Sequence, residues 1–318
     1  MRSWWNGRHA RLRGVWETVW VQIPPTAPKT VPPQGRAVFF LCGFEIIKGR
    51  RRIMYNYKIK FTKKAGASEI TDDKVYYMID DYFSTLNNNG QVISGFELYT
   101  DNTGVIYLTT VLPREDSLCD NNNNEYVKER LKDLQEVFEI EFVMEGSNFE
   151  YHTSCLCKKS SWCFLYNEGN DGESPLVCGD CHKPIPLYEV PYILGEKEHR
   201  PILNWWAAKN AMDTLWVYGL WDRFAYGQTA LYNSKLNREG RKICKALEKV
   251  LGVPVYYFIY YMSDDCEDSI IPKGLPNRKP AVCPQCNGEW VDDNEFCKCE
   301  KCRLIIDSPR WQKERNLL

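Results

Sequence analysis

Residues 283–302 read CPQCNGEWVDDNEFCKCEKC, and this stretch decides the clearest structural prediction that the sequence allows. Each C-x2-C turn can present two thiolates to one tetrahedral metal ion, and the residues between the turns can form a hairpin that closes the cage. We therefore predict a zinc ribbon over residues 280–306 that holds one structural zinc ion. Its ligands, at the spacing C-x2-C-x12-C-x2-C, are Cys283, Cys286, Cys299 and Cys302.

Two residues inside this stretch bear on the prediction. Asn287 follows the first turn, where a positive φ is commonly needed, and Asn tolerates that conformation nearly as well as Gly. Cys297 precedes Cys299 by two residues and could compete as a ligand. Disulfides and an iron–sulfur cluster are the alternatives. No secretory signal is visible to suggest an oxidising compartment, and two separated C-x2-C pairs fit a ribbon better than a cluster.

A second cysteine set lies further toward the N-terminus, at the spacing C-x-C-x20-C-x2-C. Its members are Cys155, Cys157, Cys178 and Cys181. The C-x-C pair has tighter geometry than C-x2-C, and Cys163 and His182 are spare donors. We predict a second, weaker zinc site here, with buried free thiols as the alternative. The cysteines without partners at ligand spacing are expected to be packing residues: Cys42, Cys119, Cys244 and Cys266.

Upstream of the cysteines, the pattern predicts an α+β domain over residues 54–146. A β-rich alternating run covers 55–61, and a helix begins at Thr71-Asp72-Asp73 and ends at Asn87-Asn88-Asn89-Gly90. Two strand-like runs follow at 91–99 and 104–112, then a helix after Asn124 and an alternating run at 139–143. The order β-α-β-β-α-β is that of the ferredoxin-like arrangement, which fixes no function.

The rest of the chain divides by composition into three parts. Residues 147–198 are predicted to be a Cys-rich hairpin segment, and 199–265 a helical domain that ends in a strand. The helical part contains an aromatic stripe at helical spacing, which we expect to be core: Ile202, Trp205, Trp206, Met212, Leu215, Trp216 and Leu220. A proline-rich linker over 271–280 is expected to isolate the ribbon, so that metal loss unfolds only the residues from about 280 onward.

Residues 150–304 resemble an uncharacterised bacterial family described as zinc-ribbon-containing and as candidate nucleic-acid-binding proteins. The motifs that carry the resemblance are Ser174-Pro175-Leu176, Cys178-Gly179-Asp180-Cys181, Pro186-Leu187-Tyr188, Ser234, Gly240-Arg241, Gly252, Pro254-Val255-Tyr256-Tyr257, Cys283-Pro284 and Cys302-Arg303-Leu304. Asn287, where a Gly is usual, and the extra Cys297 depart from the pattern. The resemblance implies zinc and a binding role, but it names no substrate.

The charge of the chain is unevenly distributed. Residues 1–53 contain 10 basic residues (Lys and Arg) but 2 acidic residues (Asp and Glu). Residues 54–318 therefore contain 31 basic and 40 acidic residues, which gives them a net charge of −9. Residues 19–28 can be back-translated into the T-arm and acceptor end of a transfer RNA, and 49–53 into a purine-rich ribosome-binding site. We therefore expect 1–53 to be a non-native extension, translated from an upstream tRNA gene, and the natural protein to begin at Met54. A genuine basic arm or a targeting peptide is the alternative.

The best electrostatic candidate is a predicted helix over residues 235–251. Five cations at 3-4-3-4 spacing form a basic stripe, with Arg241 at its edge: Lys235, Arg238, Lys242, Lys245 and Lys249. Leu236, Ile243, Leu247 and Val250 are expected to form the packed face. The stripe is either ordinary solvated surface or a local site for phosphate contacts on an acidic protein.

These observations favour a non-catalytic, cytoplasmic protein that binds DNA, RNA or a nucleoprotein partner. A protein-interaction adaptor is the second hypothesis, because residues 283–318 carry 6 Lys and Arg against 7 Asp and Glu and are not basic. An enzyme of unknown reaction is the third, since no nucleophile–base spacing, phosphate loop or H-E-x-x-H pattern is present. The longest apolar run, 37–47, is too short to span a bilayer, so no membrane partner is expected.

Overall fold

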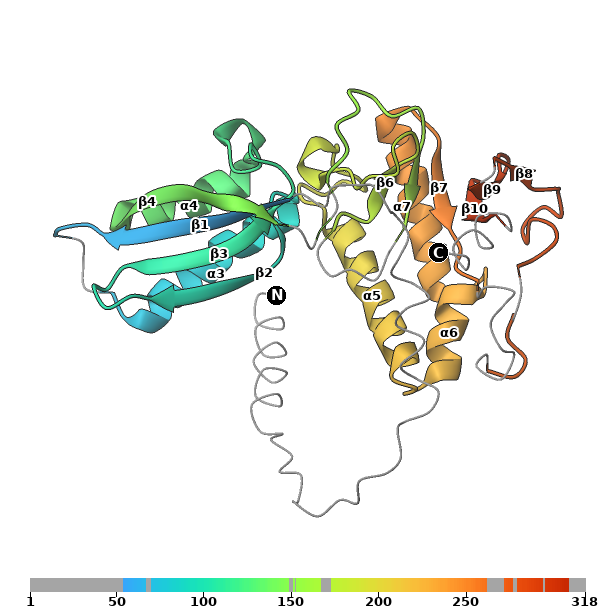
Figure 1. Ribbon diagram of the computed structural model, residues 1–318, viewed down its shortest axis with the longest axis horizontal. Coiled ribbons are helices and arrows are strands. Elements are labelled where there is room, and N and C mark those ends of the chain that lie inside the picture. Colours follow the sequence, from blue (N-terminus) through green and yellow to red (C-terminus); the bar gives the residue numbers. More distant parts are fainter. Residues whose placement is uncertain are drawn as a thin grey trace, which may run out of the picture. The chain divides into compact units, whose positions relative to one another are not determined.

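The computed structural model describes residues 54–66, 70–148, 151, 153–166, 173–261, 272–276, 279–293 and 295–308. The expected extension, residues 1–53, lies outside the described residues, as do Cys42 and Cys266. The described residues form a mixed α+β structure with two β-sheets (Figure 1).

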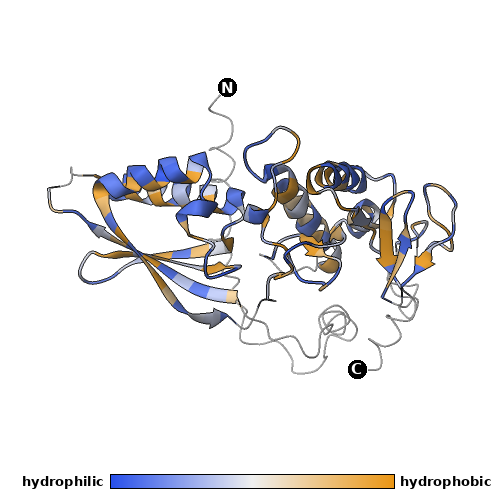
Figure 2. Cartoon of the chain, turned by 90° about the horizontal axis from the view of Figure 1, so that it is seen from above, coloured by the Kyte–Doolittle hydropathy of each residue, from blue (hydrophilic) through white to orange (hydrophobic). Residues whose placement is uncertain are grey.

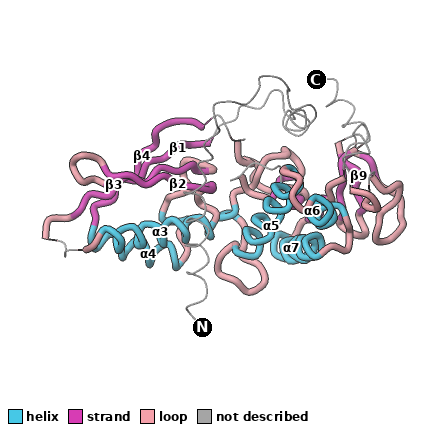
Figure 3. Tube along the Cα trace, turned by 90° about the horizontal axis from the view of Figure 1, so that it is seen from below, coloured by secondary structure: helices cyan, strands magenta, loops and turns pink. Residues whose placement is uncertain are grey.

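The first sheet is built from residues 54–148. The elements follow one another as β1 (Met54–Lys63), α3 (Asp72–Asn89), β2 (Ile93–Thr100), β3 (Ile106–Leu112), α4 (Glu125–Val137) and β4 (Phe138–Asn148), with a short 3₁₀ turn at Asp120–Asn122. Neighbouring strands are antiparallel in the order β2-β3-β1-β4. Both helices lie on the same side of this sheet (Figure 3).

Local capping explains where the two helices begin and where α3 ends. The Thr71 hydroxyl accepts a hydrogen bond from the Lys74 amide, and the Asn124 side-chain oxygen accepts one from the Val127 amide at 2.9 Å. Gly90 ends α3 in the left-handed conformation, with φ of 77°, and donates its amide to Asn87. These are the cap residues that the sequence indicated.

The core of this half lies between the sheet and the two helices. Ile59 and Phe61 on β1 are fully buried, and so are Ile79 and Leu86 on α3 and Leu134 on α4. Hydrophobic and hydrophilic residues alternate along residues 57–62 of β1, and both helices carry residues of both kinds (Figure 2). Alternate residues of β1 therefore face the helices, because successive side chains of a strand point to opposite faces.

The second sheet joins strands from three predicted segments. Its strands are β5 (Cys163–Leu165), β6 (Leu176–Cys178), β7 (Val255–Phe258), β8 (Val291–Asp292), β9 (Phe296–Cys299) and β10 (Leu304–Asp307). They lie in the order β6-β5-β7-β10-β9-β8, and β7 is parallel to both β5 and β10. The sheet thus crosses the segment boundaries predicted between 147–198, 199–265 and 280–306, so the linker does not isolate the C-terminal strands.

Three helices accompany the second sheet: α5 (Arg200–Val217), α6 (Asp222–Ala230) and α7 (Lys235–Leu251), and a short 3₁₀ turn covers Leu187–Glu189. The expectation that the aromatic stripe of α5 is core holds only in part. Ile202 and Trp205 are buried, but Leu220 lies beyond the helix and is 61% exposed. Trp216 still packs on the buried Tyr226 of α6, after which α5 ends.

Within the described ranges, no helix combines the length and the apolar composition needed to cross a bilayer.

His199, which immediately precedes α5, is a buried titratable group. Its side chain is fully buried, and neither ring nitrogen has a hydrogen-bond partner among the described residues. The ring lies 4.8 Å from that of Tyr192, measured between centroids. Burial lowers the pKa of His199 to about 4, because the protonated ring would lose its hydration without gaining a partner.

We expect this histidine to make the free energy of unfolding depend on pH. The unfolded chain binds the proton below about 6.5 and the folded chain only below about 4, so stability falls as pH decreases through this window. The loss should approach about 3 kcal/mol. Urea unfolding of wild type and His199→Leu at pH 7 and pH 4 measures it, and the variant should lose less. Equal losses in the two proteins would contradict the assignment.

Candidate metal centres

The C-terminal cysteine group brings together the four residues expected from the ribbon spacing. The Sγ atoms of Cys283, Cys286, Cys299 and Cys302 all lie within 4.8 Å of one another. The first pair stands in a turn before β8, and the second pair connects β9 to β10. Cys297, the possible competitor, is buried on β9 and is not a member of the group.

The turns that hold this group have a common backbone form. Asn287 has φ of 54° and Arg303 has φ of 53°, each directly after the second cysteine of its pair. The Asn287 amide donates to the Cys283 carbonyl, and the Cys283 amide donates to the Gly288 carbonyl, both at 2.9 Å. The left-handed residue reverses the chain so that both thiols of a turn point the same way, as predicted for Asn287.

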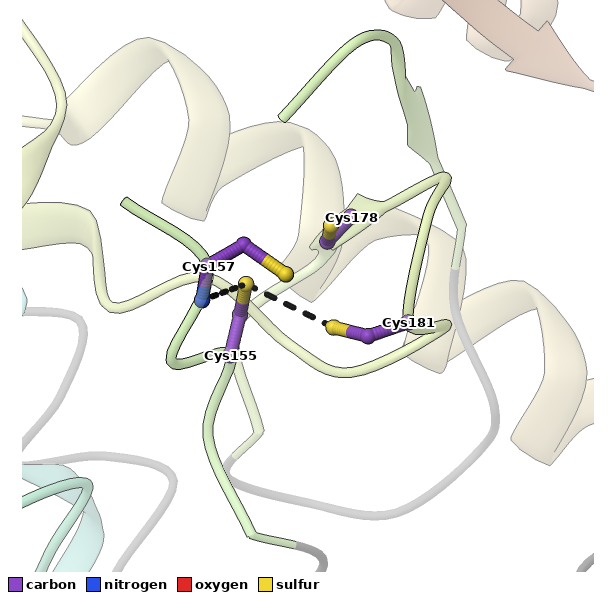
Figure 4. A group of neighbouring side chains, drawn as sticks. All are labelled: Cys155, Cys157, Cys178 and Cys181. Carbon is purple, nitrogen blue, oxygen red and sulfur yellow. Dashed lines mark hydrogen bonds between the residues drawn. The ribbon is translucent and has the colours of Figure 1, made fainter. Parts of the chain in front are cut away.

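The central group consists of Cys155, Cys157, Cys178 and Cys181, whose Sγ atoms also lie within 4.8 Å of one another (Figure 4). Its C-x2-C turn repeats the geometry of the other group. His182 follows with φ of 53° and donates its amide to the Cys178 carbonyl at 2.9 Å. Cys155 is buried, whereas Cys157, on the C-x-C side, is exposed.

Both groups fit one tetrahedral metal ion. Zinc–sulfur bonds of about 2.3 Å in a tetrahedron place sulfur atoms about 3.8 Å apart. The Cys286 and Cys299 sulfurs are 3.7 Å apart, and those of Cys155 and Cys181 are 3.5 Å apart. Each group of four thiols at this separation can hold one metal ion. Four protein ligands leave no coordination position on that ion for a substrate.

One thiol in each group has a lowered pKa. Hydrogen bonding from the Gly288 amide lowers the pKa of Cys286 to about 7. Burial opposes ionisation of Cys178, but hydrogen bonds led by the Ser160 hydroxyl at 3.0 Å outweigh it and lower the pKa. Burial raises the pKa of Cys155, and it raises the pKa of Cys181 to about 11. A lowered pKa favours the thiolate, which is the form of cysteine that a metal ion binds.

The remaining described cysteines and the spare donors lie outside both groups. Cys163 and Cys244 are buried and Cys119 is exposed. His182 instead directs Nδ1 to a carboxylate oxygen of Glu295 at 2.8 Å. The packing prediction therefore holds for the buried Cys244 but not for Cys119.

Side chains connect the two cysteine groups. Besides the His182–Glu295 contact, the Lys298 ammonium lies 3.5 Å from the centroid of the Trp162 ring. The Trp162 carbonyl accepts the Gly179 amide at 2.9 Å, and a Cβ on Gly179 would lie 2.1 Å from the Trp162 ring. Trp162 is therefore in contact with the central turn and with the C-terminal hairpin. The spacing of the cysteines did not predict this role of Trp162. In the sequence, only Gly179 inside the C-x2-C turn indicated that another residue packs closely there.

The basic stripe on α7 is exposed along its whole length. Lys235, Arg238, Lys242, Lys245 and Lys249 are all exposed, while Leu236, Ile243 and Leu247 on the opposite side are buried. Val250, expected in the packed face, is 39% exposed and lies at the end of the helix.

Arg241 is separate from the stripe. Its guanidinium carbon lies 3.7 Å from the centroid of the Tyr232 ring, and Nη1 donates to the Tyr232 carbonyl at 2.5 Å. Its side chain therefore packs against the turn between α6 and α7.

Comparison with known proteins gives relatives without an assigned activity. Residues 157–260 match a family described as a domain of unknown function, DUF2310, and residues 54–145 match another, DUF8589. Two proteins of Haemophilus influenzae (strain ATCC 51907 / DSM 11121 / KW20 / Rd), each described as an uncharacterized protein, are similar. One is 26% identical over 231 residues, covering 68% of this chain and 84% of the relative. The other is 26% identical over 172 residues, covering 52% and 79%.

Among solved structures, the crystal structure of a conserved protein from Methanosarcina mazei Go1 is similar over 34% of this chain and 97% of that chain. The identity is 14% and the TM-score is 0.22. The zinc ribbon and the nucleic-acid binding implied by the sequence resemblance remain predictions.

The first prediction for these sites concerns metal content. The purified full chain should contain about two metal ions, and Cys283→Ser and Cys178→Ser should each lose about one, because three thiolates bind a structural ion poorly. Cys297→Ser is the matched control and should lose none. Elemental analysis by mass spectrometry measures all four proteins. If Cys297→Ser loses metal and Cys283→Ser does not, the ligand set is wrong.

The second prediction concerns the contact between the groups. Glu295→Ala removes the partner of His182 and should speed metal loss to a chelator from the central group by about two- to fivefold, since a partly exposed pair contributes up to about 1 kcal/mol. Glu289→Ala, an exposed residue of the same hairpin, is the control. Both should be measured in otherwise wild-type protein, because the hairpin that presents Glu295 contains the C-terminal cysteine group, and the release phase that Cys178→Ser removes identifies the central group. Identical release rates would show that the contact does not stabilise it.

Proposed function

We propose that this chain is a non-catalytic nucleic-acid-binding protein in which two zinc ions have structural roles. Four thiolates suit zinc, which prefers tetrahedral sulfur coordination in closed structural sites. We infer a zinc ribbon for the C-terminal group and a second structural zinc for the central group. The β-α-β-β-α-β order and the strand order β2-β3-β1-β4 support a ferredoxin-like domain in residues 54–146.

The observation that carries the binding proposal is the exposed basic stripe of α7. Five cations lie on one side of a 17-residue helix whose other side is buried, so the stripe can contact a ligand without unfolding the core. The one ion pair found within the helix is a contact of 3.9 Å between Lys242 and Glu239, and both residues are exposed. Such a weak surface pair leaves the Lys242 ammonium available to a phosphate.

The charge of the rest of the chain defines the kind of binding. Residues 54–318 carry a net charge of −9, so attraction to phosphates is local and depends on this stripe. Contacts to the phosphate backbone position a protein without reading sequence. The proposed ligand is therefore DNA or RNA bound with modest affinity and little sequence preference.

The test is a salt titration of binding to duplex DNA and to single-stranded RNA. Affinity should fall with salt, with a slope of about −0.9 per neutralised phosphate on duplex and about −0.7 on single strands. Lys242→Glu with Lys245→Glu should weaken binding to every sequence and reduce the magnitude of the duplex slope by about two. Glu is a good helix former, so α7 should remain folded, which circular dichroism can verify.

The matched control is Lys128→Glu with Lys132→Glu, which makes the same charge change on exposed positions of α4. Equal weakening by both double variants would mean that net charge, not the stripe, governs binding. If wild type shows no salt-dependent binding to either nucleic acid, the proposal fails and a protein partner becomes the better hypothesis.

A further inference from the structure

The end of α5, the connection that follows it and the start of α6 expose eight consecutive residues, 217–224, which we call the α5–α6 tip. The large apolar side chains among them and their exposed fractions are Val217 at 50%, Tyr218 at 68%, Leu220 at 61%, Trp221 at 75% and Phe224 at 51%. Single exposed apolar residues are common in soluble proteins, but five among eight consecutive residues require an explanation.

The backbone of the tip holds these side chains outward. Gly219 has φ of 65°, and Trp221 has φ of 55°, a left-handed conformation that bulky residues adopt at a cost. Directly behind the tip, the ring of Trp216 lies 5.5 Å from that of Tyr226, which is fully buried. The two helices therefore pack against each other beneath the tip, while the five large apolar side chains of the tip are at least half exposed.

The area of the tip suits a contact between two copies. Multiplying the usual areas of these five side chains by their exposed fractions gives roughly 600 Å² of exposed apolar surface. This area is at the upper end of the range for a single apolar patch on a soluble monomer. Two tips placed against each other would bury about 1,200 Å² in total, the lower bound for a specific protein–protein interface.

The charges of the tip are also self-complementary. It contains one acid, Asp222, and one base, Arg223, both exposed, so its net charge is zero. In a two-fold symmetric contact, residue i of the first copy lies against residue j of the second copy, and residue j of the first copy lies against residue i of the second. Within one chain Arg223 Nη1 donates to the Lys273 carbonyl at 2.6 Å, and Asp222 Oδ1 accepts the Arg223 amide at 2.8 Å. The remaining guanidinium donors of Arg223 can then face the other carboxylate oxygen of Asp222 in the second copy, which gives two opposite-charge pairs and no like-charge pair.

We propose that the α5–α6 tip is the contact surface for a second copy of this chain, so that the protein is a two-fold symmetric dimer. The inference is independent of the proposed nucleic-acid binding. Trp221 is the central anchor, and Asp222 and Arg223 set the register.

Sedimentation velocity of the full chain over a range of concentrations tests the proposal. Wild type should dimerise, and Trp221→Asn should raise the dimer dissociation constant at least about tenfold, as expected for an aromatic anchor. Asn tolerates the left-handed conformation, so the variant should fold as well as wild type. Tyr77→Asn, which removes another exposed aromatic residue, on α3, is the matched control and should leave the constant unchanged.

A charge exchange tests the register without removing apolar area. Arg223→Asp should weaken the dimer, and Asp222→Arg combined with Arg223→Asp should restore it, since the two pairs are reformed with opposite signs. This comparison decides the question if Trp221→Asn does not fold.

Two results would overturn the proposal. One is that the wild type stays monomeric at about 100 μM, and the other is that it dimerises but neither Trp221→Asn nor Arg223→Asp weakens the dimer. Cosedimentation of a monomeric wild type with phosphatidylcholine vesicles, lost in Trp221→Asn, would assign the tip to a lipid surface instead.

Discussion

The close approach of helix α7 to strand β7 is the constraint on which the second half of the protein depends. A Cβ on Gly240 would lie 2.0 Å from the Tyr257 ring and 2.8 Å from the Trp205 indole nitrogen, so glycine is the residue that fits there. The Tyr257 hydroxyl donates to the Asn237 side chain at 2.7 Å, and the Trp205 indole donates to the Leu236 carbonyl at 3.2 Å. α5, α7 and β7 therefore meet at one buried point where both packing and hydrogen bonding are satisfied.

The positions of the two cysteine groups depend on β7, which this buried contact holds in place. β7 is held by α7 on one face and pairs with β5 on one edge and β10 on the other. β5 pairs with β6, which leads into the central C-x2-C turn, and β10 begins just after the last C-x2-C turn. The two cysteine groups are thus attached to opposite sides of one buried strand. The contact of Lys298 with Trp162 adds a direct side-chain connection between them.

Local signals in the sequence predicted local features well. Helix α7 has the predicted limits, because Ser234 caps it and Gly252 ends it, and Asn287 has the positive φ expected after a C-x2-C turn. The shared sheet was not predicted. β5 has three residues and β7 four, all apolar, and nothing in such short runs indicates which distant segment they pair with. The exposed end of α5 was also missed, since helical periodicity does not reveal where the partners of a helix end.

The order of strands in the second sheet has a consequence for synthesis on the ribosome. Residues 54–148 contain every strand of the first sheet, so that half can fold as soon as it has emerged. The second sheet pairs Cys163 with Val255 and Leu304 with Tyr257, so the edge of β7 that pairs with β10 stays open until Leu304 has been made. Pairing between distant segments is slow and leaves apolar strands exposed meanwhile. The nascent chain should therefore depend on chaperones most strongly between the emergence of β7 and that of β10.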